Sequence, residues 1–152
     1  MNPAQLRTRA LALLARREHS RSELRRKLLR SMPPAQGDEP PVDIDALLDE
    51  LAAKGCLSEE RFVESRLHVR AARFGSQRIR QELAQHGLKL SPAQQQALSV
   101  TELERAREVW RRKFGALPPA DAAQRARQGR FLAARGFAPD VVARVLRGAD
   151  ED

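Results

Sequence analysis

Aromatic residues and cysteine are scarce in this chain of 152 residues, which has one Trp, five Phe, no Tyr and one Cys. β-Sheet architectures favour aromatic and β-branched residues. This sequence instead favours Ala, Leu, Arg, Gln and Glu, which are good helix formers. The composition therefore predicts an all-α protein, organised as one compact domain or as a short array of small units.

The single cysteine and the lack of long hydrophobic runs exclude further classes of protein. Cys56 has no partner for an internal disulfide and cannot build a metal cluster alone. No stretch reaches the roughly 18 apolar residues of a membrane span, and Arg7 and Arg9 interrupt the N-terminal segment in which a signal peptide would be apolar. We therefore expect a soluble, cytoplasmic protein that does not associate with membranes.

Residues for catalysis do not form a recognisable pattern. His19, His68 and His86 are scattered, with no pair at the helical spacing that would bind a metal ion. His19 directly precedes a predicted helix start, which indicates a turn residue, and Cys56 is more typical of a small interior residue than of a nucleophile. The acidic residues of 43–50 fit a helix start and a solvated face better than a magnesium site. Because there is also no phosphate-binding glycine loop and no nucleophile elbow, we expect no enzyme activity, cofactor, metal ion or small-molecule ligand.

Signals for the starts and ends of helices are frequent. Ser20 with Glu23 and Thr101 with Glu104 have the spacing of capping boxes. Glycines mark several helix ends, and the proline-rich segment 31–41 is typical of a mobile loop. These signals predict nine helices, over 3–17, 20–31, 43–54, 58–74, 76–86, 91–99, 101–114, 119–135 and 139–147.

The nine segments fall into three sets of three, which indicates an internal repeat of about 50 residues. The middle helix of each set has a pair of core positions four residues apart: Leu24 and Leu28, Ile79 and Leu83, and Gln128 and Leu132, where the third pair has a polar first member. We predict three tandem three-helix repeats, covering 1–57 with the loop 31–41, 58–100 and 101–152. Such repeats stack on their neighbours, so we expect an elongated, curved array.

A net charge of +8 is the strongest compositional signal, and it is spread unevenly along the chain. Residues 1–30 carry nine basic and two acidic side chains, whereas residues 31–60 carry one basic and eight acidic ones. Of the 28 basic residues 24 are arginine, whose planar guanidinium suits phosphate and carboxylate groups better than lysine does. The charge therefore predicts a polyanionic partner, either nucleic acid or an acidic protein groove.

The middle of the chain offers the strongest candidate contact for such a partner. Arg66, Arg70 and Arg73 have the spacing of one stripe on a helix, where like charges repel one another. Arg78 and Arg80 follow at the start of the next helix, where the helix dipole disfavours cations. An anionic partner would relieve both effects, so reversing Arg70 and Arg73 to Glu should weaken partner binding without loss of helix. The predicted partner- or nucleic-acid-binding residues are Arg25, Arg26, Lys27, Arg66, Arg70, Arg73, Arg78, Arg80, Arg111, Arg112, Lys113, Arg127, Arg130 and Arg135.

Three segments together resemble the bacterial RecX family, which regulates the RecA recombinase. They are LLARREHSRSELRRKL, LAAKGCLSEERFVESRLHVRAARFGSQRIRQELAQHGL and RFLAARGFAPDVVARVLRG, and the resemblance runs from about residue 10 to residue 147. It implies a modular fold of three-helix repeats that lies in the groove of the RecA filament on DNA. It also implies inhibition or modulation of ATP hydrolysis, filament growth, strand exchange and co-protease activity, hence of recombination, DNA repair and the SOS response. No catalytic residue is implied.

Two other functions stay open from the residues themselves. The chain could be a helix-turn-helix transcription regulator that uses 20–31 as its recognition helix, or a basic scaffold that binds any nucleic acid with a steep salt dependence. In the favoured function, binding to DNA alone is weak and depends on salt. The acidic segment 38–60 is then expected to face away from the partner or to meet basic residues of an adjacent subunit.

Overall fold

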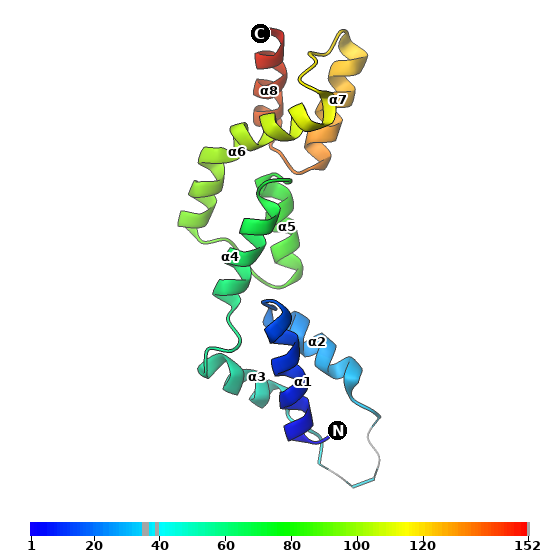
Figure 1. The fold of residues 1–152 in the computed structure, drawn as a ribbon, viewed down its shortest axis with the longest axis vertical. Helices are drawn as coiled ribbons and strands as arrows, with labels where there is room; N and C mark the ends of the chain where they lie inside the picture. Colours follow the sequence, from blue (N-terminus) through cyan, green and yellow to red (C-terminus); the bar gives the residue numbers. More distant parts are fainter. Residues whose placement is uncertain (35–36, 39, 152) are drawn as a thin grey trace. The chain divides into compact units, whose positions relative to one another are not determined.

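The structure, a computed structural model, describes residues 1–34, 37–38 and 40–151. In this part of the chain it consists of eight α-helices without strands, which confirms the predicted all-α class (Figure 1). The chain divides into two compact units, Met1–Ser65 (unit 1) and Arg66–Asp152 (unit 2). The helices are α1 (Pro3–Arg16), α2 (Arg21–Ser31), α3 (Ile44–Ala53), α4 (Glu59–Arg70), α5 (Ser76–Gln85), α6 (Pro92–Phe114), α7 (Ala122–Ala134) and α8 (Pro139–Glu151).

Unit 1 is built on a three-helix core in which α2 packs against α1 and α3 (Figure 1). Leu24 and Leu28 of α2 are fully buried, as their helical spacing predicted. They pack in one cluster with Leu6 of α1 and with Leu48 and Leu51 of α3. Apolar faces of three short helices thus enclose a single core, which none of them could bury alone.

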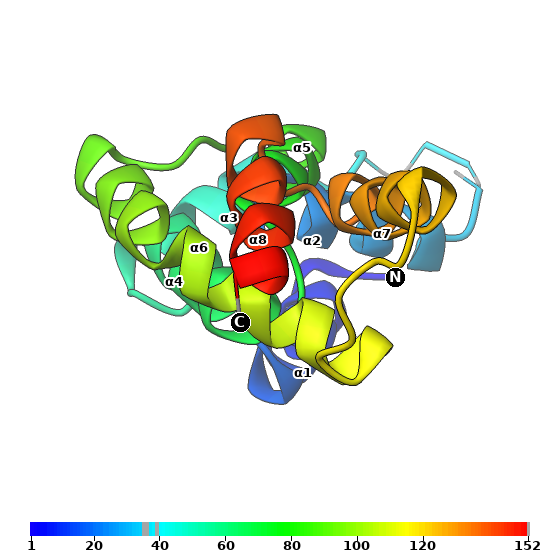
Figure 2. The ribbon, with the colours of Figure 1, turned by 90° about the horizontal axis from the view of Figure 1, so that it is seen from above.

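Unit 2 has its main core among its last three helices. α8 packs against both α6 and α7, as the two views in Figures 1 and 2 agree. Ala106 and Trp110 of α6, Leu132 of α7 and Val145 of α8 lie in this cluster, together with Phe137 from the turn before α8. Leu132 is therefore a core residue, as the internal repeat predicted. Ile79 and Leu83, the core positions of the middle helix in the second repeat, are each 1% exposed.

The prediction of nine helices is wrong, because the segments 91–99 and 101–114 form one continuous helix, α6. Thr101, expected to cap a new helix, lies inside α6 and donates its hydroxyl to the carbonyl oxygens of Ala97 at 3.4 Å and Leu98 at 3.3 Å. A threonine hydroxyl that bonds the preceding turn in this way is compatible with a helix interior. No proline or glycine interrupts the helix between Pro92 and Phe114.

The capping box predicted at Ser20 forms only in part. The Ser20 hydroxyl accepts the backbone N–H of Glu23 at 3.1 Å and so caps α2. The Glu23 carboxylate instead accepts two hydrogen bonds from the Arg17 guanidinium, at 2.9 and 2.8 Å. A charged, bidentate donor binds a carboxylate more strongly than the backbone N–H of the cap would.

Two helix ends differ from the prediction. α4 ends at Arg70, so that Arg73 lies in the following turn and not on a helical stripe. The carbonyl groups of that turn are bound from α6, where the Arg105 guanidinium donates to the oxygens of Ala71 at 2.9 Å and Phe74 at 2.7 Å. An arginine can satisfy the carbonyl groups of a final helical turn, which lack intrahelical partners. α8 continues beyond the predicted end at 147 to Glu151.

Two glycines place the turn before α5 beside the turn before α8 within unit 2. Gly75 donates its N–H to the Arg135 carbonyl at 2.8 Å, and Gln77 donates to the Gly136 carbonyl at 3.2 Å. A Cβ atom on Gly75 would overlap the backbone of Gly136, and one on Gly136 would overlap Arg78. Only glycine allows this close approach, and Gly136 also has a φ of 90°, which other residues rarely adopt.

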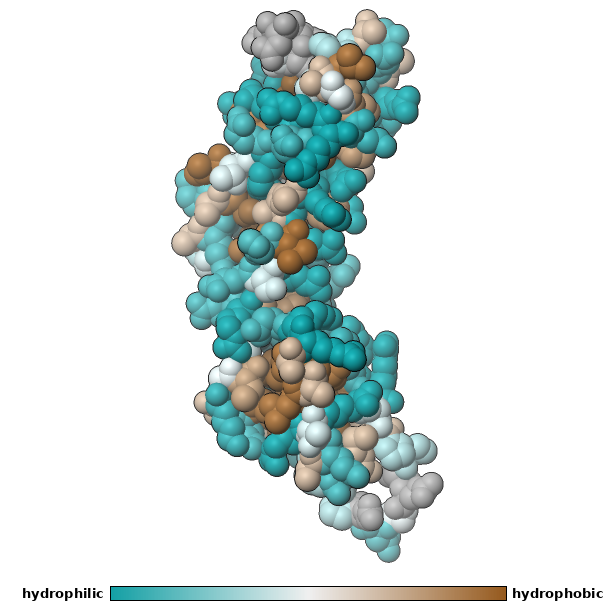
Figure 3. Space-filling view, viewed as in Figure 1, coloured by the Kyte–Doolittle hydropathy of each residue, from teal (hydrophilic) through white to brown (hydrophobic). Residues whose placement is uncertain are grey.

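The surface is mostly hydrophilic. On the face drawn in Figure 3, hydrophilic residues cover most of the surface and hydrophobic ones gather in a patch over the helices of unit 1. Among the described residues, no helix has both the length and the apolar character that a membrane crossing requires.

Candidate anion-binding site

The two units differ sharply in charge. Unit 1 contains eleven basic and eleven acidic residues and is therefore neutral. Unit 2 contains seventeen basic and nine acidic residues, so the whole net charge of +8 lies there. The basic excess of residues 1–30 is cancelled within unit 1, which makes unit 2 the place to look for a polyanion site.

The cancellation in unit 1 is direct, through ion pairs between helices. Acidic side chains of α3 pair with basic side chains of α1 and α2, so these acidic residues are engaged within their own unit. Asp43, expected at a helix start, does cap α3 by accepting the Ala46 N–H at 3.0 Å. The pairs are Arg7–Glu50 at 2.7 Å, Arg21–Asp49 at 2.7 Å and Arg25–Asp45 at 3.2 Å.

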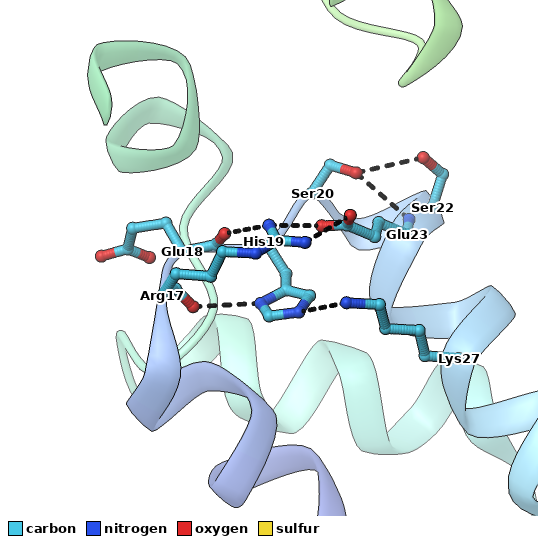
Figure 4. Close-up of polar contacts among 7 residues, drawn as sticks. All are labelled: Arg17, Glu18, His19, Ser20, Ser22, Glu23 and Lys27. Atoms are coloured by element: carbon cyan, nitrogen blue, oxygen red, sulfur yellow. Dashed lines mark hydrogen bonds and ion pairs between the residues drawn. The ribbon is translucent and has the colours of Figure 1, made fainter. Parts of the chain in front are cut away.

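His19 lies at the centre of a polar network that joins α1 to α2 (Figure 4). The ring is 1% exposed, and it contacts the Arg17 carbonyl through Nδ1 at 3.0 Å and the Lys27 ammonium through Nε2 at 2.9 Å. Because an ammonium group only donates, Nε2 accepts and Nδ1 carries the proton that is donated to Arg17. Burial lowers the pKa of His19, in keeping with this neutral form. His19 lies between the two helices, as predicted, and the contacts of its ring connect them.

Glu23 is the anionic member of the same network. Burial alone would raise its pKa, but the hydrogen bonds and charge of Arg17, the charge of Lys27 and, in acid, the charge of protonated His19 lower the pKa to about 2. The predicted contact residues of α2 are Arg25, Arg26 and Lys27. Lys27 contacts His19, and Arg25 forms an ion pair with Asp45. Arg26 is exposed and forms no ion pair with a described residue.

In unit 2 the cations gather around Phe74, which lies in the turn between α4 and α5. The Phe74 ring is 8% exposed. The guanidinium carbon atoms of Arg70, Arg78 and Arg135 lie 5.0, 4.4 and 5.3 Å from its centroid. Each distance is within the range of a cation–π contact, so one buried ring holds three arginines from different parts of the chain.

Phe131 of α7 forms a second centre beside the first. The Lys113 ammonium nitrogen lies 5.4 Å from its centroid, and the Arg135 guanidinium carbon lies 5.2 Å from it. The Phe114 ring contacts the Phe131 ring edge-on, with 5.4 Å between the centroids and 83° between the ring planes. Because Arg135 contacts both Phe74 and Phe131, it links the two groups of cations.

The residues Arg70, Arg73, Arg78, Arg112, Lys113 and Arg135 are called the basic cluster below. Part of it borders an open hollow of about 290 Å³. Glu82 is the carboxylate that opposes Arg70 at 3.1 Å and Arg78 at 3.8 Å. Glu108 opposes Arg112 at 3.2 Å. The hollow is lined by Ala72, Arg73, Val109, Arg112, Lys113, Phe131 and Arg135.

The other predicted contact residues lie outside the basic cluster. Arg66 borders a separate hollow of about 200 Å³ on α4 and α5, which the Glu82 carboxylate also lines. Arg111 pairs with Glu108 at 3.7 Å. Arg80, Arg127 and Arg130 are exposed on α5 and α7. The structure thus unites six of the fourteen predicted residues and leaves the rest apart from them.

The role of the phenylalanines was missed in the sequence. Phe74 falls at the end of the predicted helix 58–74, yet it lies in the turn after α4 and its ring is covered by arginines. The pair Arg-Phe occurs at 61–62, 73–74 and 130–131, and Phe62 is an ordinary core residue, so the pair alone gives no signal for a ring that holds arginines. Among the described residues no group of His, Cys, Asp and Glu side chains could hold a metal ion.

Comparison with known proteins identifies a family for nearly all of the chain. Family models described as the first, second and third three-helix domains of RecX match residues 7–36, 58–91 and 101–146. The chain is 57% identical over 152 residues to regulatory protein RecX of Leptothrix cholodnii, covering 97% of this chain and 90% of that protein. It is 49% identical to regulatory protein RecX of Ralstonia pickettii and 48% identical to that of Ectopseudomonas mendocina, covering 98% and 99% of this chain and 91% and 98% of those proteins.

Proposed function

The chain belongs to the RecX family of regulatory proteins, and from this premise we propose that it binds the RecA–DNA filament and inhibits or modulates its activities. The activities concerned are ATP hydrolysis, filament growth, strand exchange and co-protease function. Through them the protein would act on recombination, DNA repair and the SOS response in the cytoplasm. It would act by binding and not by catalysis.

The observation that supports a polyanionic partner is the placement of the net charge. All of it lies in unit 2, where four of the six cations of the basic cluster contact Phe74 or Phe131. Among the described residues only Glu82 and Glu108 oppose the cluster. Six cations opposed by two carboxylates attract anions over a distance, which raises the rate of association with a polyanion. A DNA-bound filament offers both phosphates and acidic protein side chains.

A helix-turn-helix transcription regulator is the less favoured function. Its recognition helix would be α2, but Arg21 and Arg25 of that helix are engaged with Asp49 and Asp45 of α3. A recognition helix needs side chains that can reach base edges in the major groove. Sequence-specific binding to duplex DNA that does not change when recombinase is added would favour this function over the one proposed.

The test is the rate of ATP hydrolysis by a bacterial RecA filament on single-stranded DNA, titrated with this protein at two salt concentrations. Binding to the same DNA without recombinase is measured in parallel. We expect inhibition at protein concentrations well below those that coat the bare DNA, because the filament is the ligand. An unchanged rate, or inhibition only when the free DNA is saturated, would leave a general basic DNA-binding protein and contradict the proposal.

A further inference from the structure

We infer that the hollow bordered by Arg73, Arg112, Lys113 and Arg135 binds the phosphodiester backbone of single-stranded DNA without preference for the bases. This inference rests on the proposed function and deepens it, because it names the DNA strand as the ligand of unit 2 and selects four residues that contact it.

The four cations come from three separate elements that converge on one hollow. Arg73 lies in the turn after α4, Arg112 and Lys113 lie in the last turn of α6, and Arg135 follows α7. Arg73, Arg112 and Lys113 are exposed, and Arg135 is half-buried against two aromatic rings. A DNA backbone that lies across the hollow can therefore contact cations from several sides.

The hollow contains more positive charge than a single protein carboxylate can neutralise. Among the described residues its lining includes four cations and no carboxylate, although Glu108 reaches Arg112 from the next turn of α6. Elsewhere in the chain, the Glu23 carboxylate is satisfied by one guanidinium through two hydrogen bonds. A nucleic acid strand carries one negative charge per nucleotide and can present several phosphates to one surface. The number of converging cations thus favours a phosphodiester backbone over an isolated acidic side chain.

The aromatic residue of the hollow does not offer a free stacking surface. The Phe131 ring already contacts Lys113, Arg135 and Phe114. Stacking on single-stranded bases requires an aromatic face that the base can cover. We therefore expect contact through phosphates alone, which carry no sequence information.

The experiment measures fluorescence anisotropy of short labelled oligo-dT with the full chain over a range of salt concentrations. The site variant combines Arg73→Ala, Arg112→Ala and Lys113→Ala. The matched control combines Arg9→Ala, Arg16→Ala and Arg30→Ala, three exposed arginines of unit 1, and has the same net charge as the site variant. Circular dichroism and thermal unfolding show whether both variants fold as the wild type does.

We expect the site variant to bind oligo-dT more weakly and to reduce the slope of log Kobs against log salt by about 2, because three phosphate contacts are lost. The control variant should keep the wild-type slope, and oligo-dA should bind like oligo-dT. If the site variant keeps the wild-type slope, or if the control loses as much as the site variant, the inference is wrong. Should the triple variant fail to fold, Arg73→Ala alone is expected to reduce the slope by about 0.7.

Three further outcomes separate this inference from the proposed function, since the DNA measurement contains no recombinase. A site variant that binds DNA normally but no longer inhibits the recombinase would assign the hollow to acidic protein residues and overturn the inference alone. Poly-glutamate that competes as well as oligo-dT for the wild type, but not for the site variant, would overturn it in the same way. Loss of DNA binding in the site variant, with a wild type that leaves recombinase unaffected, would support the inference and contradict the proposed function.

Discussion

Unit 1 and unit 2 use the same kind of helix for opposite electrostatic purposes. In unit 1, Arg21 and Arg25 of α2 face carboxylates of α3, and the unit is neutral. In unit 2, Arg78 of the equivalent helix α5 packs on the Phe74 ring and donates to the Ala134 carbonyl at 3.2 Å. Its carboxylate partner Glu82 lies farther away, at 3.8 Å, and is shared with Arg70. Aromatic faces and carbonyl oxygens hold a guanidinium in place without cancelling its charge.

The number of arginines in a segment therefore does not locate a binding surface. Residues 1–30 carry nine basic side chains, yet unit 1 as a whole is neutral, and four of the nine form ion pairs within it: Arg7, Arg17, Arg21 and Arg25. What matters is whether the partner of each cation is an anion or a neutral group.

The close approach of two turns in unit 2 has no counterpart at the glycine that ends α3 in unit 1. A methyl group on Gly136 would overlap Arg78, whereas one on Gly55 would meet no atom within 4 Å, although both have positive φ, at 90° and 77°. We expect Gly136→Ala to lower the free energy of unfolding by about 3 kcal/mol or more, and Gly55→Ala by about 1 kcal/mol. Chemical denaturation of both variants measures this, and equal losses would contradict the steric role of Gly136.

Acid should destabilise unit 1 through Glu23. The pKa of this carboxyl is about 2 in the folded chain and 4.5 ordinarily, so between these values the unfolded state binds more protons. Stability from this group is complete above pH 4.5 and falls by about 3 kcal/mol as the pH drops to 2. His19 acts in the same direction below pH 6.5, because its folded pKa is lowered from that value.

Amide hydrogen exchange of α2 as a function of pH measures this loss. The Glu23→Gln variant should be less stable than the wild type at neutral pH and should lack the wild-type change between pH 4.5 and 2. If the variant kept the wild-type pH profile, another carboxyl group would be responsible.

Gln128 is a polar residue at a repeat position that is apolar in unit 1, and it therefore needs a hydrogen-bond partner in the core of unit 2. Gln128 is 6% exposed and accepts the Trp110 indole N–H at 2.8 Å, whereas the equivalent Leu24 is fully buried in an apolar core. Gln128→Leu should cost about 1–3 kcal/mol by leaving the indole N–H unpaired, and adding Trp110→Phe should restore part of that loss. Thermal unfolding of the two single variants and the double variant measures the coupling, and simple additivity would show that the hydrogen bond is unimportant.

The ion pairs of unit 1 should contribute little stability one by one. Arg25 and Asp45 are 49% and 60% exposed, so water and salt screen their attraction. A double-mutant cycle with Arg25→Ala and Asp45→Ala should give a coupling of about 0.5 kcal/mol that decreases with salt. A coupling above about 2 kcal/mol would show that this pair determines the packing of α2 on α3.

Much of the helical framework was predictable because it depends on residues close together in the chain. Leu24 and Leu28, Ile79 and Leu83, and Leu132 are core residues, as spacing and repeat comparison indicated. The Ser20 cap and the all-α class follow from equally local signals. Where a local signal was ambiguous, as at Thr101, the prediction of a helix boundary failed, since a threonine can either cap a helix or bond to the preceding turn.

The candidate site was predictable only as a set of arginines. Arg66, Arg70 and Arg73 were grouped by an assumed helix that in fact ends at Arg70. Lys113 and Arg135, far along the chain, join Arg73 because the turns at Gly75 and Gly136 meet and because Phe131 lies between them. Neither contact has a local signature in the sequence.

Most of the helices and their buried faces could be predicted from the sequence, as could the family resemblance, because propensity, capping and periodicity act over a few residues. The tertiary structure decided which charges are cancelled and which remain available. Arg25 and Asp45 are 20 positions apart, and Arg7 and Glu50 are 43 apart, yet each pair lies within hydrogen-bond distance. Coulomb energy depends on distance in space, and that distance is known only once the helices have packed.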